Sequence, residues 1–169
     1  HRTEPPLPPR RCYLPVDLLW SSRFNETAAR GRAMLSMRLV RMIEDHAEQI
    51  TRGVLDDLQR NPRTSAYHRL DREELHRRVY DVYRNLGRWL SEKSEEAIAA
   101  SYGELGRRRC AEGIPLSEVV YALVLIKYHL RDYVRTAGLT DSAVELYQEQ
   151  ELHRLVGHFF DRATYHTVR

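Results

Sequence analysis

The sequence predicts an all-α fold, and three observations lead to that prediction. Apolar residues recur every three or four positions over several long segments, which is the period of an amphipathic helix. No segment alternates apolar and polar residues as a half-buried strand does, and no Asn-Gly pair marks a hairpin. Charged residues make up 30% of the 169 residues, somewhat above the usual quarter, which suits solvated helix faces. We therefore expect about five long helices joined by short turns.

The N-terminal region departs from this helical pattern. Most prolines of the chain lie between Pro5 and Pro15, and proline disfavours helix while it favours extended polyproline geometry. Apolar residues follow, so this segment either docks on the folded body or on a partner, or stays a loosely packed leader. It lacks the apolar region of a signal peptide. We expect a proline-rich N-terminal arm or linker at 1–35 and one helical domain at 36–169.

An apolar stripe at helical spacing predicts the first helix of the domain, and Asn61-Pro62 ends it, because the residue before a proline avoids helical backbone. The stripe consists of Leu39, Ile43, Ala47, Ile50, Val54 and Leu58. A short connector with Tyr67 and Leu70 as core anchors leads to Asp71, a good N-cap for the next helix. The stripe of that next helix consists of Leu75, Val79, Val82, Leu86 and Trp89 or Leu90.

The following segment is expected to restart as a helix at Ser91 or Ser94 and to end at Gly113, which suits a C-cap. Pro115 suits the first turn of another helix. The inward-facing positions between these limits are Ile98, Tyr102 and Leu105.

Residues 116–137 form the most apolar element, which is typical of the centre of a bundle or of a subunit interface. Its stripe consists of Val119, Leu123, Ile126, Leu130 and Val134, widened by Val120, Val124 and Leu125. Gly138 is expected to end this helix, and Thr140 or Asp141 to begin the last one. The last helix runs to the end of the chain without a stop signal, which suggests that the parent protein continues into a further module.

The sequence contains no constellation of catalytic or metal-binding residues. The metalloprotease spacing His-Glu-x-x-His, a glycine-rich phosphate loop and the Gly-x-Ser-x-Gly elbow are all absent. Cys12 and Cys110 form no zinc arrangement; we expect free thiols in a reducing cytosol, with a disulfide between them as the alternative. We predict neither an enzyme nor a metal site, and a cytoplasmic location.

Charge and hydropathy argue against two further classes of partner. The net charge is only +3, and the basic run Arg107–Arg109 is flanked by Glu104 and Glu112. A nucleic-acid-binding stripe needs more uncompensated charge on one face. No apolar run approaches the roughly 20 residues of a membrane helix. We predict neither nucleic-acid binding nor membrane insertion.

The segment from Tyr102 to Leu123, with its Gly-Ile-Pro-Leu helix start, resembles the N-terminal sensory domain of RsbR-type stressosome proteins, which is also found at the front of bacterial histidine kinases. Three further pieces agree: Trp89-Leu90-Ser91, Lys127 to Tyr133, and Phe159 to Ala163 with Tyr165. The resemblance covers roughly residues 36–168. It implies a globin-like bundle without haem, in homodimers that pass an unidentified small-molecule or protein signal to an output module such as a kinase or STAS domain.

A haem-binding gas or redox sensor is the alternative function. If the helices are placed on a globin, residues 93–112 take the place of the helix that carries the proximal ligand, and they contain no histidine. His76 would fall on the distal side, but a distal histidine without a proximal one holds no iron. His129 is interpreted as a core or interface histidine that hydrogen-bonds a neighbour. We expect no cofactor; His129 and His76 are the candidate ligands if haem is bound.

The last helix offers more apolar surface than one bundle face needs, and pairing with a second copy would bury the excess. The residues expected at this dimer interface and output helix are Leu152, Leu155, Phe159 and Phe160. The alternative for Phe160 is that it packs against the N-terminal arm.

A second group, Tyr102, Arg109, Gly113 and Pro115, is expected to be a structural or effector-binding motif. Arg109 can cap the carbonyls at the end of its own helix, or it can bind an anionic effector. A scaffold domain without a signal input is a third functional hypothesis, beside the haem-free sensor and the haem sensor.

Overall fold

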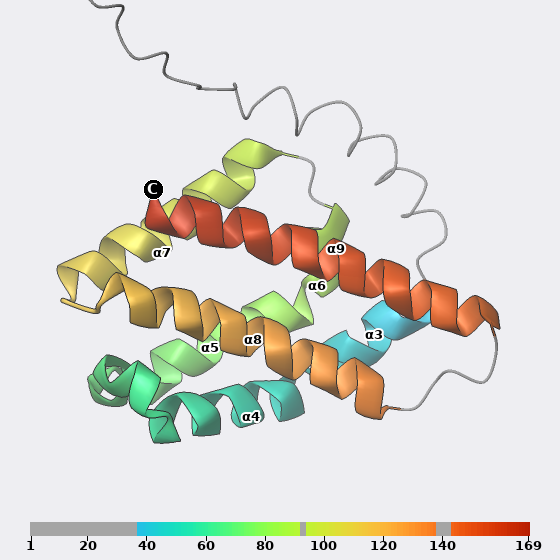
Figure 1. Cartoon of the computed structure of the whole chain (residues 1–169), viewed down its shortest axis with the longest axis horizontal. Coiled ribbons are helices and arrows are strands. Elements are labelled where there is room, and N and C mark those ends of the chain that lie inside the picture. The colour runs from blue at the N-terminus through green and yellow to red at the C-terminus, as the bar shows by residue number, and fades with distance from the viewer. Residues whose placement is uncertain (1–36, 92–93, 138–142) are drawn as a thin grey trace, which may run out of the picture. The chain divides into compact units, whose positions relative to one another are not determined.

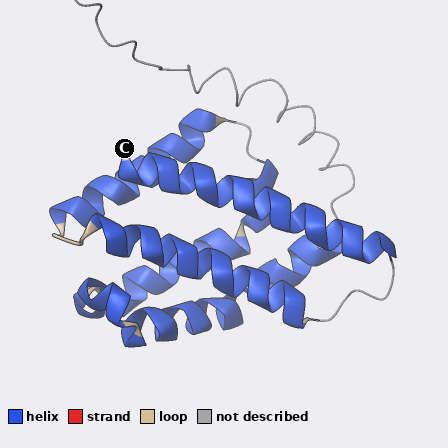
Figure 2. Ribbon diagram, viewed as in Figure 1, coloured by secondary structure: helices blue, strands red, loops and turns tan. Residues whose placement is uncertain are grey.

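The computed structural model describes residues 37–91, 94–137 and 143–169. All described residues belong to one compact unit of the chain. Every regular element in the described ranges is helical (Figure 2), which confirms the all-α prediction. The predictions for the arm at 1–35, Cys12, Gly138, Thr140 and Asp141 lie outside the described residues.

The described elements are seven α-helices and one 3-10 helix, and none of these helices is long and apolar enough to cross a membrane. They are α3 (Met37–Asp45), α4 (Ala47–Arg60), η1 (Pro62–Arg69), α5 (Arg72–Arg84), α6 (Leu86–Ser91), α7 (Glu95–Ala111), α8 (Leu116–Thr136) and α9 (Ala143–Val168). α9 lies along α7 and α8, while α4 packs against α5 and α8 (Figure 1). α8, predicted to be the most apolar helix, therefore has neighbours on several sides.

Two of the predicted helices are each broken once, so the prediction of about five long helices is wrong in this respect. The first is divided at His46 into α3 and α4, and the second at Asn85 into α5 and α6. Asn85 has φ −112° and ψ 26°, and its side-chain amide donates to the Asp81 carboxylate at 2.8 Å. Such local side-chain bonds compete with helical backbone. The apolar spacing continues across both breaks, so periodicity alone does not reveal them.

The apolar stripes of the predicted helices form the core. Every residue of the first stripe and of the α8 stripe is at most 9% exposed. Val124 is an exception among the positions expected to widen the α8 stripe, because it is 43% exposed, whereas Leu125 is buried. The Tyr83 hydroxyl donates to the backbone carbonyl of Ile126 at 2.7 Å and so ties α5 to α8.

The N-caps predicted at Asp71 and Ser94 are confirmed. The Asp71 carboxylate accepts from two backbone N–H groups in the first turn of α5, at 3.3 and 3.1 Å. The Ser94 hydroxyl accepts from the backbone N–H of Ala97 in the first turn of α7 at 3.2 Å. These bonds satisfy N–H groups that have no partner inside the helix, and the alternative start at Ser91 is excluded.

Gly113 ends α7, as the sequence predicts. Its φ of +68° is a left-handed backbone conformation that glycine adopts without steric cost. Its N–H donates to the carbonyl of Cys110 at 3.0 Å, and the N–H of Ile114 donates to the carbonyl of Arg109 at 2.9 Å. This is the Schellman pattern of a helix end. Pro115 stands directly before the first residue of α8, one position earlier than expected.

Gly106 lets α7 and α9 approach each other more closely than a side chain would permit. A Cβ atom at this position would lie 2.1 Å from the backbone oxygen of Thr167. Gly103, on the same part of α7, has more room, because its Cβ would lie 3.8 Å from the backbone oxygen of His166. The C-terminal end of α9 therefore rests against α7 (Figure 1).

We expect Gly106→Ala to destabilise the domain, because one helix must shift to relieve the clash. The free energy of unfolding should fall by about 1–3 kcal/mol, the usual cost of overpacking. Gly157→Ala on α9 is the control: no described atom lies within 4 Å of the added Cβ, so the better helix former should stabilise by about 0.5–1 kcal/mol. Urea unfolding measures both variants, and equal stabilities would contradict the close contact.

Candidate functional site

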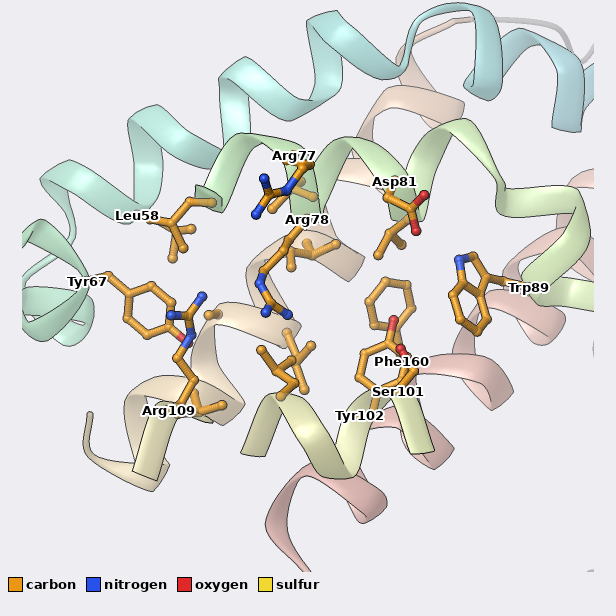
Figure 3. A pocket seen from close by; sticks show the side chains of 18 residues that line it. Leu58, Tyr67, Arg77, Arg78, Asp81, Trp89, Ser101, Tyr102, Arg109 and Phe160 are labelled. Atoms are coloured by element: carbon orange, nitrogen blue, oxygen red, sulfur yellow. The ribbon is translucent and has the colours of Figure 1, made fainter. Parts of the chain in front are cut away.

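A cavity of about 370 Å³ lies between α5, α7 and α8 (Figure 3). Pockets of this size hold small molecules in other proteins. Arg77, Asp81 and Ser101 are exposed members of its lining, so the cavity reaches the surface beside them. Its apolar wall consists of Leu58, Leu75, Val79, Val82, Leu105, Val119, Ala122, Leu123 and Ile126.

Aromatic rings close one end of the cavity. Trp89, Tyr102 and Phe160 line it there (Figure 3), and Phe159 packs directly behind them. The ring centroids are 6.1 Å apart for Trp89 and Tyr102, and 5.1 Å apart for Phe159 and Phe160. Edge-on contacts at these distances are favourable. They connect α6, α7 and α9 at this end.

Arg109 lies at the other end (Figure 3) and is buried, with 1% of its surface exposed. Its guanidinium carbon lies 5.6 Å from the ring centre of Tyr67, and its Nη1 donates to Glu112 at 2.6 Å. Its Nη2 lies 3.5 Å from the Glu74 carboxylate. The backbone N–H groups of Gly113 and Ile114 bind carbonyls at this end of α7 instead. Of the two roles expected for Arg109, capping of its own helix is not the arrangement observed here, because its side chain contacts carboxylates.

Glu74 is shared by three arginines. One of its oxygens lies 2.7 Å from Arg78 Nε, 3.4 Å from Arg108 Nη1 and 3.5 Å from Arg109 Nη2. Burial raises the pKa of Glu74, but the guanidinium groups outweigh burial and hold the pKa below its usual value. Arg77 also lines the cavity and has no ion pair within the described residues. This end of the cavity therefore carries more positive than negative charge.

Two buried hydrogen-bond donors of the lining have no partner within the described residues: Arg109 Nε and Trp89 Nε1. Buried polar groups are almost always hydrogen-bonded, so each exception requires an explanation. Tyr102 adds a third donor, because burial and the Asp81 carboxylate raise its pKa well above the usual value and the hydroxyl keeps its proton. Burial likewise raises the pKa of Tyr67 to about 12, although Arg109 opposes the rise.

The candidate haem ligands lie outside the lining of the cavity. His76 Nε2 is 2.9 Å from Glu48, and His129 Nε2 is 3.2 Å from Asp57, which confirms that His129 hydrogen-bonds a neighbour. Both carboxylates belong to α4 but are about 13 Å apart along its axis at 1.5 Å per residue. Among the described residues of the lining there is no histidine, cysteine or methionine. No cluster of metal-ligating side chains occurs in the part of the chain that the structure describes.

The four α9 residues expected at a dimer interface lie in the core of the single chain. Leu152, Leu155, Phe159 and Phe160 are 0%, 6%, 2% and 1% exposed. Phe160 lines the cavity, and Phe159 packs on Trp89 and Tyr102. The sequence suggested more apolar surface on α9 than one neighbouring helix could cover. In the structure two helices, α7 and α8, cover it, and the spacing of apolar residues cannot show this. As they stand, these side chains present no surface to a second copy.

Residues 45–169 match the model of one protein family, described as the RsbT co-antagonist protein rsbRD N-terminal domain. The chain belongs to this family. The match confirms the resemblance to RsbR-type N-terminal domains and places the chain in a family of regulatory domains. No curated protein and no solved structure matches the chain. The matched range contains every residue that lines the cavity, so the cavity belongs to the rsbRD N-terminal domain itself.

The sequence of this rsbRD N-terminal domain indicates only part of the site. Tyr102 and Arg109 stand in the segment that carries the resemblance, and both line the cavity. Glu74 and Arg78 are an i,i+4 pair whose spacing is visible in the sequence. Their link to Arg109 is a contact between two helices, for which the sequence gives no local signal. The unpartnered nitrogen of Trp89 is likewise a property of packing.

We expect Glu74→Gln to destabilise the rsbRD N-terminal domain by about 2 kcal/mol at neutral pH, because buried Arg109 would lose a counter-charge. A carboxyl whose folded pKa is lowered contributes its full stability above the ordinary value of 4.5 and loses it as the pH falls through the folded pKa. The difference from wild type should therefore shrink below pH 4.5.

Urea unfolding of both proteins at neutral pH and below pH 4.5 measures this difference in the free energy of unfolding. Glu104→Gln is the control, because Glu104 pairs with Arg107 on the exposed surface of α7 and should have little effect at either pH. A Glu74→Gln deficit that is the same at both pH values would contradict the role of the charge.

Proposed function

We propose that the chain is the sensory and signal-relay domain of a cytoplasmic bacterial signalling protein, and that it acts without haem through a globin-like dimer. The family match over residues 45–169 carries the proposal. The family description names a co-antagonist of RsbT, so we place the chain upstream of a partner of that kind. The output module that follows in the parent protein would be a kinase or STAS domain.

The composition of the cavity supports a haem-free domain. Haem iron needs a proximal histidine, cysteine, methionine or tyrosine ligand. Among the described lining residues only Tyr67 and Tyr102 are of these types, and burial raises the pKa of each hydroxyl, which disfavours the tyrosinate that would bind iron. His76 and His129 are already engaged by carboxylates of α4.

The C-terminal end of α9 is suited to carry a signal out of the domain. Glu95, at the start of α7, accepts from Arg162 at 2.6 Å and contacts His166. Burial raises the pKa of Glu95, but His166 and Arg162 outweigh burial and lower it. The last turns of α9 are thus held to α7 by a charged pair as well as by the approach of Thr167 to Gly106. A shift of α7 would move this end of α9 and whatever follows it.

The surface for a homodimer would be the exposed faces of α8 and α9. Val124 and Tyr128 on α8 are 43% and 57% exposed, and Tyr147 and Tyr165 on α9 are 49% and 55% exposed. The two α9 tyrosines are 18 residues apart, a whole number of turns at 3.6 residues per turn, so they share one side of the helix. Pairing with a second copy would bury these side chains.

The relay is tested in the whole parent protein with Glu95→Gln. The substitution weakens the hold of α7 on the end of α9, so the resting activity of the output module should change at least about fivefold, the lower range of allosteric coupling. Stability should fall by no more than about 1 kcal/mol, because the Glu95 side chain is half exposed. Glu104→Gln is the matched control on the same helix. Unchanged output from Glu95→Gln would exclude this route.

The dimer is tested by sedimentation of the full chain over a range of concentrations. We expect a dimer, and Tyr128→Arg should raise its dissociation constant at least about tenfold, because a charge would enter an apolar interface. Ala100→Arg, at an exposed position of α7, is the control. A single-chain particle at every concentration, or a dimer that Tyr128→Arg leaves intact, would contradict this surface.

A further inference from the structure

We propose that the cavity binds a small, mostly apolar monocarboxylate that carries a second oxygen acceptor at the end opposite its carboxylate. The inference goes beyond the regulatory role, because it names a ligand class, and it depends neither on the dimer nor on the relay. It rests on the charge at one end of the cavity and on the unpartnered donors at its two ends.

The charge of the wall selects an anion. Arg77, Arg78 and Arg109 line the cavity, whereas Asp81 is the single carboxylate among the described residues of the lining. Glu74, just outside the lining, is already shared by three guanidinium groups. An anionic ligand would therefore meet net positive charge at this end, in a site where burial strengthens the attraction.

The remaining donor of Arg109 selects a small head group. Its Nη1 and Nη2 already face Glu112 and Glu74, and its buried Nε has no partner within the described residues. One N–H donor suits one oxygen of a carboxylate. A phosphate would bring a second charge and further oxygens, whereas Arg109 Nε is the one buried nitrogen without a partner at this end within the described residues. The adjacent wall is apolar, which suits the body of an acid and not a nucleotide.

The far end supplies a donor for a second oxygen. Trp89 Nε1 is buried there without a partner, and the ring of Trp89 lies 6.1 Å from that of Tyr102. Tyr102 and Arg109 are seven residues apart on α7, which corresponds to about 10 Å along the helix axis. The two donors therefore lie at opposite ends of the cavity, and a ligand that reaches both is elongated.

The volume and the lining residues of the cavity indicate the size and the chemical character of the ligand's central part. A volume of 370 Å³ corresponds to roughly a dozen water-sized atoms at ~30 Å³ each. The rings of Trp89, Tyr102 and Phe160 suit an aromatic group at the far end. The compound 3-(4-hydroxyphenyl)propanoate meets each requirement: its carboxylate, aromatic body and distal phenol oxygen match the size and the two ends of the cavity.

Isothermal titration of the full chain with 3-(4-hydroxyphenyl)propanoate tests the proposal. We expect saturable one-to-one binding with a dissociation constant below about 1 mM. The neutral amide of the same compound should bind at least about tenfold more weakly, and 3-phenylpropanoate, which lacks the phenol oxygen, about three- to tenfold more weakly. Inorganic phosphate should not bind. No saturable binding of the acid, or equal binding of acid and amide, would overturn the proposal.

Three variants locate the site. Ala122→Leu fills the cavity from α8 and should abolish binding, while Ala100→Leu, at an exposed position of α7 outside the lining, should not. Trp89→Phe keeps an aromatic ring but removes the N–H, so it should erase the preference for the phenol over 3-phenylpropanoate. If Ala122→Leu fails to fold, the Trp89→Phe comparison decides alone. Binding that neither substitution alters would place the ligand elsewhere and overturn the proposal.

Discussion

A buried guanidinium needs carboxylates and hydrogen-bond acceptors around it, and the buried guanidinium of this domain is that of Arg109. Three elements meet to satisfy it: Glu112 follows on its own chain segment, Glu74 comes from α5, and Tyr67 of η1 covers it with its ring. The end of α7, the start of α5 and the connector between α4 and α5 are therefore fixed relative to one another. The buried Nε of Arg109 has no partner within the described residues, so it remains a donor that a ligand oxygen could accept from.

The second constraint acts on the other side of α7. Glycine at position 106 removes the side chain that would keep α9 away, and the backbone of Thr167 takes its place. Glu95 then holds the neighbouring turn of α9 through Arg162 and His166. A backbone contact of this kind is intolerant of small changes, because packed helices cannot deform continuously. The ion pair is more adaptable, since Glu95 is half exposed.

The sequence predicts well those features that depend on local pattern. Helix stripes and caps follow from spacing and from residues such as Asp71 and Gly113, and the structure has them where expected. Local sequence pattern does not predict the features that depend on which helices pack against each other. Phe159 and Phe160 are apolar residues of a terminal helix, and only the packing of α7 and α8 shows that they belong to the core. The helix breaks at His46 and Asn85 leave the spacing of the apolar residues unchanged, so that spacing does not predict them.

The site shows the same division. Arg109 and Tyr102 could be found because they stand in a recognisable segment, but their chemistry could not, since it depends on Glu74 and Trp89 from other helices. From the sequence alone, a basic residue near the C-terminal end of a helix is interpreted as a cap, because the contacts between helices are not known. The Schellman bonds after Gly113 satisfy the carbonyls first, and that leaves the arginine side chain for the interior.

The two faces of α7 make it the element that can join a ligand to the end of α9. Tyr102 and Arg109 line the cavity, while Gly103 and Gly106 meet α9. At about 100° per residue, Gly103 and Gly106 lie roughly 40–120° around the helix from Tyr102 and Arg109, so the two sets occupy adjacent sides of one rigid rod. A ligand in the cavity can shift the equilibrium between two packings of α7 only by the difference in its affinity for them. Tight binding to both packings would shift nothing. A sensor built this way therefore needs its ligand to bind one packing better, and the unpartnered donors at the ends of the cavity are the groups whose geometry could differ between them.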